Sequence, residues 1–292
     1  MTVTPTRPVA SVDELRRAWS AIQRGDFRDR PTAEYAVPDA ADGGGCRPVP
    51  LWAPPGRVIP VLGALPQCGA TTTALAVATA AAPAAVIECA SAATSGLTSA
   101  ATAELGTSRS GWALGRRDQV WIARASRTHR GAECVPVPDQ RAVPAECGVL
   151  VLDVSWDLAH VLATPGWIRT AVLDAPGVVV VAAPSVPGVR RLETVLGMLA
   201  GRYALVAMVG PARRRWPRHV SAATGPLTRQ AVGEERMVSI ALDKHLATRG
   251  LDGSPLPGPL LAAAAELNHT LTTLPEPLEP GEPSDTSERP QP

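Results

Sequence analysis

Short apolar runs alternate with helical segments from Arg57 to about residue 274, and this alternation leaves few folds open to the chain. Because the apolar runs are continuous, each is expected to be a strand buried on both faces. Such strands, separated by helices, predict a doubly wound, mostly parallel sheet in three α/β/α layers. The predicted strands lie at 58–62, 85–87, 149–152, 178–183, 204–209 and 238–242, and the predicted helices at 71–82, 188–199 and 259–274. The stretch at 106–144 is expected to hold an insertion with a strand at 119–122.

A different pattern precedes this region. Ser11 and Glu14 have the spacing of a helix-capping box, and an apolar stripe of period three to four predicts an amphipathic helix over about 11–24. The following stretch to Pro55 is rich in Pro and Gly and predicts a linker. Residues 1–56 are therefore expected to be a helix on a flexible linker, which either packs on its own domain or docks on a protein partner.

The end of the chain predicts a third region. Residues 275–292 carry five acidic side chains and one basic side chain, are rich in proline, and have almost nothing to bury. A segment of this composition cannot offset its ordering entropy, so we expect an acidic, disordered tail. The α/β domain is thus expected to span 57–274, between two flexible termini.

Composition excludes several classes of protein. The longest nearly apolar stretch, 74–87, is too short to cross a bilayer, and no signal peptide is visible. Five cysteines without a CxxC pair argue against a disulfide framework and a structural zinc site. The net charge is +1, which gives no overall attraction to nucleic acid or membrane. We expect a cytoplasmic protein without a transmembrane segment, a prediction compatible with peripheral association with a membrane apparatus.

The segment between the first predicted strand and helix carries the clearest functional signal. It reads PVLGALPQCGATTTALAVA, a buried strand followed by a tight turn and a helix. In such a turn the first N–H groups of the helix and its dipole face one point, where they favour an anion. The alternative is a turn that only starts the helix. The predicted phosphate-binding residues are Gln67, Cys68, Gly69, Ala70, Thr71 and Thr72.

This loop departs from the phosphate-loop pattern G-x-x-x-x-G-K-[ST]. Ala64 stands where the first glycine belongs, and Ala70 stands where the lysine belongs. That lysine makes a charge-assisted contact to phosphate, and contacts of this kind are worth about 1.5–3 kcal/mol. The chain contains a single lysine, Lys244, among its 28 Lys and Arg residues. We therefore predict that lysine-dependent hydrolysis of the usual kind is absent.

A carboxylate at the end of a later strand predicts a metal site. Asp153 follows the apolar run at 149–152, where a carboxylate can orient Mg²⁺ or a water molecule. Asp153 is the predicted catalytic residue, and Asp153 with the Thr71 hydroxyl is the predicted Mg²⁺ site. Asp157 and Glu88 are weaker candidates on the metal side. The alternative is an aspartate that only caps the strand end.

The order of these elements resembles the ParA/MinD-type branch of P-loop NTPases, most closely its divergent pilus-assembly and septum-site members that lack the Walker A lysine. Residues 68–72 are similar to the family's G-A-[ST]-T variant of the loop, GVLVLDVSWD is similar to its Walker B strand, and ALVAMVGPARRR falls where its adenine-contacting strand and loop lie. The family's signature lysine falls on Leu65, and of its Asp-x-Asp-Pro only Glu88 keeps a carboxylate. The resemblance covers about 57–274. It implies a P-loop NTPase-like fold with ATP or ADP and Mg²⁺ as cofactors, or no cofactor if the loop is inactive.

Arginine is concentrated in two stretches. Residues 109–130 hold six arginines and one acid, and residues 202–218 hold five arginines and no acid. Such clusters either form a sequence-independent contact to DNA, with Trp216 as a stacking group, or are solvated loops. The predicted DNA-contact residues are Arg213, Arg214, Arg215 and Arg218.

Three functional hypotheses follow. The first is a degenerate ParA/MinD-like protein that hydrolyses nucleotide weakly or not at all and acts as a scaffold or positioning component of a bacterial secretion, pilus, conjugation or partition assembly. The second is an active MgATP-dependent ATPase with an atypical Walker A loop, cycling between monomer and homodimer. The third is a non-specific DNA-binding partition factor that uses the arginine clusters.

Overall fold

The computed structural model describes residues 16, 19–20 and 52–275. The chain comprises two units, Met1–Pro48 and Val49–Pro292. In the first unit the three described residues are helical and exposed. The rest of the predicted helix at 11–24, most of the linker and residues 276–292 lie outside the described residues. Within the described part of the chain, no helix is long and apolar enough to cross a membrane.

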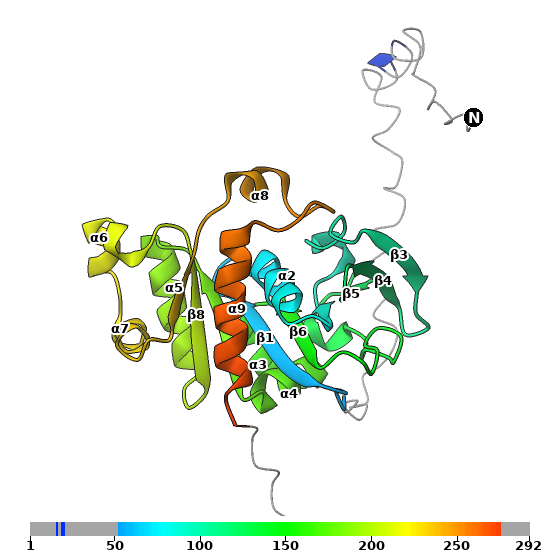
Figure 1. Ribbon diagram of the computed structural model, residues 1–292, viewed down its shortest axis with the longest axis horizontal. Helices are drawn as coiled ribbons and strands as arrows, with labels where there is room; N and C mark the ends of the chain where they lie inside the picture. Colours follow the sequence, from blue (N-terminus) through cyan, green and yellow to red (C-terminus); the bar gives the residue numbers. More distant parts are fainter. Residues whose placement is uncertain (1–15, 17–18, 21–51, 276–292) are drawn as a thin grey trace, which may run out of the picture. The chain divides into compact units, whose positions relative to one another are not determined.

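The second unit is built on a nine-stranded sheet with the order β3-β4-β5-β2-β6-β1-β7-β8-β9 (Figure 1). Along the sheet, every pair of neighbouring strands from β5 through β2, β6, β1, β7 and β8 to β9 is parallel. Strands β3 and β4 are added beside β5 by antiparallel pairing. The predicted doubly wound, mostly parallel sheet is thus confirmed. The strands are β1 (Arg57–Gly63), β2 (Ala84–Glu88), β3 (Ala103–Thr107), β4 (Trp112–Arg117), β5 (Val120–Ala125), β6 (Val149–Val154), β7 (Gly177–Ala182), β8 (Tyr203–Val209) and β9 (Met237–Ile240).

Helices cover both faces of the sheet. Helices α2 and α9 lie side by side on one face (Figure 1) and share a core with alternate residues of the strands. The opposite core takes side chains from α3 to α7. The helices are α2 (Ala70–Ala80), α3 (Leu158–Ala163), α4 (Trp167–Asp174), α5 (Val186–Met198), α6 (Arg218–Ala222), α7 (Pro226–Gly233), α8 (Lys244–Arg249) and α9 (Gly258–Thr272).

The continuous apolar runs are explained by these two cores. Successive side chains of a strand point to opposite faces, so a strand covered on both sides is apolar at most of its positions. In β7 all six residues are buried. Val179 and Val181 lie in the core with α2 and α9, whereas Val178 and Val180 lie in the opposite core.

The stretch at 106–144 contains more structure than its sequence predicts. The expected strand at 119–122 is present as β5, but β3 and β4 were not predicted, because β3 is exposed along its whole length and β4 is broken by Gly115 and two arginines. The cluster at 109–130 is not a continuous basic surface, since Arg117 and Arg124 are buried. The Arg117 guanidinium donates to the carbonyls of Ala100 (3.2 Å) and Asp252 (2.6 Å).

The strand order fixes where a ligand can bind. Strand β1 lies between β6 and β7, while the helix that follows it, α2, leads to β2 on the far side of β6. The chain therefore leaves β1 toward one side of the sheet and later continues on the other side. In open α/β sheets this change of direction opens a crevice at the carboxyl ends of the strands. The loop between β1 and α2 lies at this point.

Candidate functional site

The loop between β1 and α2 is tied to the neighbouring strand β7. The Ala64 N–H donates to the Val181 carbonyl (2.8 Å), and the Cys68 thiol donates to the same oxygen (3.3 Å). Gly69 has a φ of 93°, a left-handed conformation that favours glycine, and Gln67 shares this region with a φ of 59°. No side chain caps the N-terminus of α2. The 11-residue helix therefore presents uncapped, electropositive N–H groups at the end of the turn.

The Cys68 side chain fills the inside of the loop. It is 5% exposed, and a Cβ atom placed on Gly63 would lie 3.2 Å from its Sγ atom. Burial raises the pKa of the Cys68 thiol, and backbone N–H groups of the loop, including those of Leu65 and Ala70, partly offset this rise. Cys68 is thus a buried packing side chain. Its predicted part in phosphate binding is limited to its backbone.

Ala70 begins α2 with a methyl group at the position of the missing lysine. The residue is half-buried, and its Cβ would lie 3.4 Å from a Cβ atom on Gly63. Small side chains therefore fill this part of the loop, and no positively charged side chain of the loop lies at the uncapped N–H groups. Thr71 and Thr72, the next two predicted residues, are also half-buried in the first turn.

Asp153 lies within β6 and is fully buried. Its register partners are Val61 on β1 and Glu88 on β2, so the three side chains share the face that α2 covers. Neither carboxyl oxygen of Asp153 has a hydrogen-bond partner among the described residues. Burial, and next the Glu88 carboxyl, raise the pKa of Asp153 to about 7, whereas the hydroxyls of Thr71 and Ser155 act to lower it. A buried carboxyl without a partner, beside a hydroxyl, fits the oxygen ligands of a hard cation such as Mg²⁺.

Glu88 has a different role from the one predicted, because its carboxyl group holds a loop. It is 1% exposed and accepts hydrogen bonds from the Ser95 hydroxyl, the Gly96 N–H (2.5 Å) and the Leu97 N–H (3.2 Å). Burial raises the pKa of Glu88, and these hydrogen bonds and the charge of Arg124 partly offset the rise. Three donors occupy its two carboxyl oxygens, so the main role of Glu88 is to hold the loop at residues 95–97.

The loop that Glu88 holds lies directly on the first turn of α2. A Cβ atom on Gly96 would be 2.9 Å from Thr71 Cγ2 and 3.4 Å from Thr71 Oγ1. Only a glycine allows this close approach. Residues 95–97 therefore form a cover, held by Glu88, over the side chain that stands beside Asp153. We call residues 95–97 the cover loop.

Replacing Glu88 with alanine should release the cover loop. The Gly96 and Leu97 N–H groups lose their acceptor, so their amide hydrogen exchange should become at least about tenfold faster, while the core strands keep their protection. Hydrogen exchange with mass spectrometry or NMR measures this. The control is Glu266→Ala, which removes an exposed glutamate of α9. Unchanged exchange at Gly96 and Leu97 in the Glu88 variant would show that other contacts hold the loop.

The row of charges continues beyond Glu88. Arg124 on β5 is the register partner of Glu88, and its guanidinium donates to both carboxyl oxygens of Glu104 (2.8 Å each) and to the Thr98 carbonyl (3.2 Å). No pattern in the sequence indicates this row of charged side chains. Its members lie in strands whose neighbours become known only from the strand order.

A cavity of about 420 Å³ lies at the carboxyl ends of β8 and β9. A Cβ atom on Gly69 would lie 3.4 Å from Val209, the last residue of β8, but the residues that line the cavity begin at Gly210 and include none from the loop or from α2. We call it the β8–β9 pocket; it is lined by Gly210, Pro211, Ala212, Arg215, Ser239, Ala241 and Leu242.

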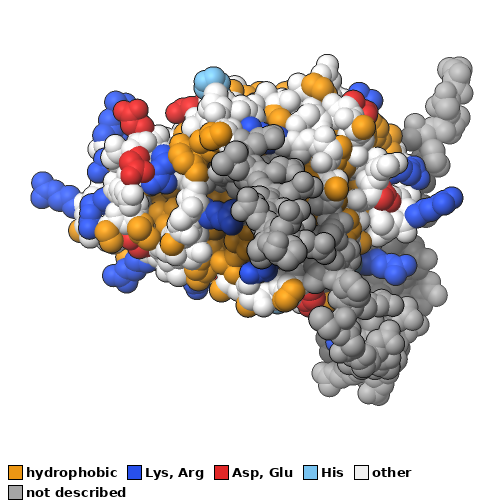
Figure 2. All heavy atoms as spheres, turned by 90° about the horizontal axis from the view of Figure 1, so that it is seen from below, with side chains coloured by type: hydrophobic (Ala, Val, Ile, Leu, Met, Phe, Trp, Pro, Cys, Tyr) orange, Lys and Arg blue, Asp and Glu red, His pale blue; other side chains and the backbone are white. Residues whose placement is uncertain are grey.

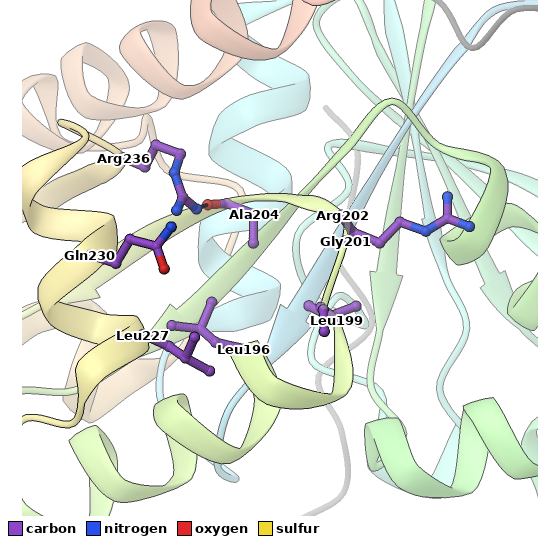
Figure 3. A pocket seen from close by; sticks show the side chains of 9 residues that line it. Leu196, Leu199, Gly201, Arg202, Ala204, Leu227, Gln230 and Arg236 are labelled. Carbon is purple, nitrogen blue, oxygen red and sulfur yellow. Dashed lines mark hydrogen bonds between the residues drawn. The ribbon is translucent and has the colours of Figure 1, made fainter.

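A second, smaller cavity of about 130 Å³ lies at the amino end of β8 (Figure 3). Leu196, Leu199 and Leu227 form its apolar wall, and Gln230 and Arg236 face each other across it. Both polar side chains already have partners: Arg236 donates to the Ala204 carbonyl (2.8 Å) and to Glu234, and Gln230 donates to Glu234. This cavity is at the opposite end of the strands from the loop. It takes no part in the candidate site.

The predicted DNA-contact arginines are exposed. Arg213, Arg214 and Arg215 form the short 3-10 helix η3 (Arg213–Arg215), and Arg218 begins α6. Trp216 is 8% exposed and donates its indole N–H to the Pro211 carbonyl (2.9 Å), so the proposal that it stacks on a base is wrong. On the face seen in Figure 2, Lys and Arg side chains are scattered and do not form one continuous patch.

Comparison with known proteins finds similarity only among solved structures. No model of a protein family matches the chain, and no curated protein matches it. The septum site-determining protein MinD complexed with Mg-ADP from Pyrococcus horikoshii matches with a TM-score of 0.46 and 14% identity, over 74% of this chain and 97% of that chain. The MinC:MinD cell division protein complex of Aquifex aeolicus matches with a TM-score of 0.47 and 16% identity, over 73% of this chain and 95% of that chain.

A plasmid partition protein of Borrelia burgdorferi bound to AMPPNP gives a TM-score of 0.45 and 9% identity, over 74% of this chain and 98% of that chain. The matching structures are thus MinD and plasmid partition proteins, the group that the sequence resembles. At these identities the likeness concerns the fold and does not extend to activity.

Proposed function

We propose that this chain is a degenerate ParA/MinD-like P-loop protein that binds nucleotide weakly or not at all, hydrolyses it weakly or not at all, and acts as a scaffold or positioning component of a bacterial assembly. One observation carries this proposal: Ala70 stands at the start of α2 where the phosphate-binding lysine belongs, and the loop before it is packed with the Cys68 side chain. Phosphoryl transfer relies on positioned charge to stabilise the transition state, so a loop without its cation lacks the main catalytic contribution.

The cover loop supports the same proposal. Asp153 is fully buried, and Gly96 lies against Thr71, so residues 95–97 cover part of the predicted metal site. If Mg²⁺ and nucleotide are held, the N–H groups at the start of α2 would face the phosphates, and Thr71 and Asp153 would face the metal ion. Mg²⁺ would supply neutralisation of phosphate charge.

A scaffold needs surfaces for partners. Trp19, in the helix predicted over 11–24, is 63% exposed, which supports docking of that helix on a protein partner. A homodimer and a place in a secretion, pilus, conjugation or partition apparatus belong to the same proposal. They rest on the resemblance of the sequence.

Phosphate release from MgATP separates this proposal from a working ATPase. We expect full-length protein to release no phosphate above the buffer rate, and we expect Asp153→Ala to leave that rate unchanged. A working ATPase predicts steady release that Asp153→Ala abolishes. Circular dichroism of the variant controls for folding.

A DNA-binding partition factor is the second candidate, favoured by the exposed residues Arg213, Arg214, Arg215 and Arg218. Binding through phosphate contacts weakens steeply with salt because counterions are released from the DNA. Titration of duplex DNA at low and high salt tests it. Binding that is absent at low salt, or that does not change with salt, would remove this candidate.

A further inference from the structure

We propose that the acidic stretch at residues 276–288 docks on the surface formed by α5, η3, α6 and α7 of the same chain and shields the arginines there. We call this part of the chain, residues 186–236, the α5–α7 flank. The contact goes beyond the proposed function and is independent of it, because it involves neither a nucleotide nor the loop before α2.

The positive charge of the domain is concentrated in the α5–α7 flank. The flank holds nine arginines and three acidic residues, whereas residues 52–185 and 237–275 together hold eleven Lys and Arg and twelve Asp and Glu. Eight of the nine arginines are exposed. Helices α5, α6 and α7 lie at the end of the sheet formed by β8 and β9 (Figure 1). The excess of arginine is therefore at one end of the domain, and the rest of the domain is close to neutral.

Two of the three acidic side chains of the flank already have partners. Glu193 accepts hydrogen bonds from the N–H groups of Leu227 (2.8 Å) and Thr228 (2.9 Å) at the start of α7. Glu234 accepts from the guanidinium of Arg236, the one arginine of the flank that is not exposed. These acids therefore do little to neutralise the exposed arginines of the flank.

The exposed arginines include several without a partner. Among the residues that the structure describes, no hydrogen bond or ion pair engages the guanidinium groups of Arg202, Arg214 and Arg218. Arg202 directly precedes β8, Arg214 lies in η3, which follows β8, and Arg218 begins α6. Cations are thus available at both ends of β8.

The chain leaves the domain beside the flank. Arg57 donates a hydrogen bond to the Leu274 carbonyl (2.7 Å), and a Cβ atom on Gly177 would lie 2.8 Å from Leu274 Cδ1 and 3.3 Å from Tyr203 Cδ1. The end of α9 is therefore fixed at the amino ends of β1, β7 and β8. Arg202, the residue before Tyr203, is the exposed arginine of the flank at this same end.

The sequence that follows has a regular arrangement of acids. Every third residue is acidic, and prolines at 277, 280 and 283 separate the first four acids. Proline favours the extended polyproline helix, which has three residues per turn and rises about 3.1 Å per residue. In that conformation the five carboxyl groups would share one side, about 9 Å apart, over about 37 Å. The acids are Glu276, Glu279, Glu282, Asp285 and Glu288.

The length and the spacing of this stretch fit the flank. Strand β8 has seven residues and is about 20 Å long, so a stretch of about 37 Å can pass from Arg202 to η3 and Arg218. Carboxyl groups about 9 Å apart suit separate arginines, and on the face seen in Figure 2 the arginines are scattered. A tethered segment also acts at an effective concentration in the millimolar range, which favours it over an anion from solution.

A labelled peptide of residues 275–292 tests the proposal by competing with the tail of the full-length protein. In the tail-neutral variant the five acids are replaced, as Glu276→Gln, Glu279→Gln, Glu282→Gln, Asp285→Asn and Glu288→Gln. NMR of the peptide at about 0.05 M salt follows weak binding to both proteins. The tail-neutral variant should bind the peptide at least about fivefold more tightly, because its own tail no longer occupies the arginines. At about 0.5 M salt this difference should disappear.

Arginine variants of the tail-neutral protein locate the docking surface. Replacing Arg202, Arg214 and Arg218 together with alanine should weaken peptide binding by about tenfold, because three ion pairs with carboxyl groups are lost. The matched control removes the same charge from three exposed arginines outside the flank and should change the affinity by less than about twofold. The control arginines are Arg109, Arg127 and Arg141.

Three results would overturn the proposal. Equal affinity of the peptide for the unmodified and the tail-neutral proteins would show that the tail does not occupy the arginines. Equal losses in the two triple variants would show that only the net charge of the domain acts. Failure of the tail-neutral variant to bind the peptide would overturn the proposal as well, and binding of duplex DNA in its place would assign the arginines to nucleic acid.

Discussion

Replacing Ala70 with lysine should raise the affinity of the protein for MgADP by about ten- to a hundredfold. The variant restores a cation at the start of α2, where the uncapped N–H groups already face the point at which a phosphate would bind. A charge-assisted contact to phosphate is worth about 1.5–3 kcal/mol, which corresponds to this gain. Ala70 is half-buried, so the longer side chain has a path to solvent and need not disturb the core. Calorimetric titration of both proteins measures the change.

Ala70→Met is the matched control for this gain. It adds an unbranched side chain of similar length without a charge, so it tests whether bulk alone changes the loop. We expect no gain in affinity from methionine. If lysine also gives no gain, while the variant unfolds at the same temperature as the unmodified protein, the loop does not present its N–H groups to phosphate.

Replacing Asp153 with asparagine should stabilise the protein at alkaline pH. The pKa of Asp153 is raised to about 7 in the fold, mainly by burial, so the folded state keeps the proton of this carboxyl over a pH range in which the unfolded chain has lost it. Its contribution to stability is therefore present at low pH and is lost as the pH rises from about 4 to 7. Above pH 8 the ionised group costs the folded state on the order of 4 kcal/mol. The asparagine variant avoids this cost.

Urea unfolding at pH 5 and pH 9 measures the effect. The variant should gain more stability over the unmodified protein at pH 9 than at pH 5. Asp174→Asn changes an exposed carboxyl and should show no such difference between the two pH values. A gain of the same size at both pH values would show that Asp153 is not protonated in the fold at neutral pH.

The parallel strands of the sheet could be predicted from the sequence, whereas the antiparallel strands β3 and β4 could not. Runs such as the one that forms β7 are apolar throughout, because both faces of the strand are covered, and this pattern is readable without knowing its neighbours. Strand β3 is exposed at the edge of the sheet, and β4 is interrupted by Gly115 and two arginines, so neither has this continuous apolar pattern. Helix α2 was predicted within two residues at each end because an alanine-rich segment follows the turn at Gly69.

The candidate site was predictable only where its residues are consecutive. The loop and Asp153 were identified because each stands at the end of a readable strand. The cover loop was not, since the hydrogen bonds of Glu88 to residues 95–97 join a strand end to an irregular segment. Trp216 was predicted to be a stacking group for the same reason, because its burial and its hydrogen bond to the Pro211 carbonyl depend on the fold around η3.

Ala70, Cys68 and the cover loop have a common consequence. The first removes the cation, the second fills the loop, and the third covers the hydroxyl beside Asp153. In the proposed function each of these features weakens phosphate binding by a different physical route, so reversing one of them should restore only part of the binding. For this reason we expect Ala70→Lys to improve binding without producing turnover, as long as Glu88 holds residues 95–97.

Calorimetric titration of the unmodified, full-length protein with MgATP, with phosphate release followed in the same samples, tests the central claim most directly. We predict a dissociation constant weaker than about 0.1 mM, or no measurable heat of binding, and no phosphate released above the buffer rate. Micromolar binding together with steady phosphate release would contradict the account and identify the protein as an ATPase that works without the lysine.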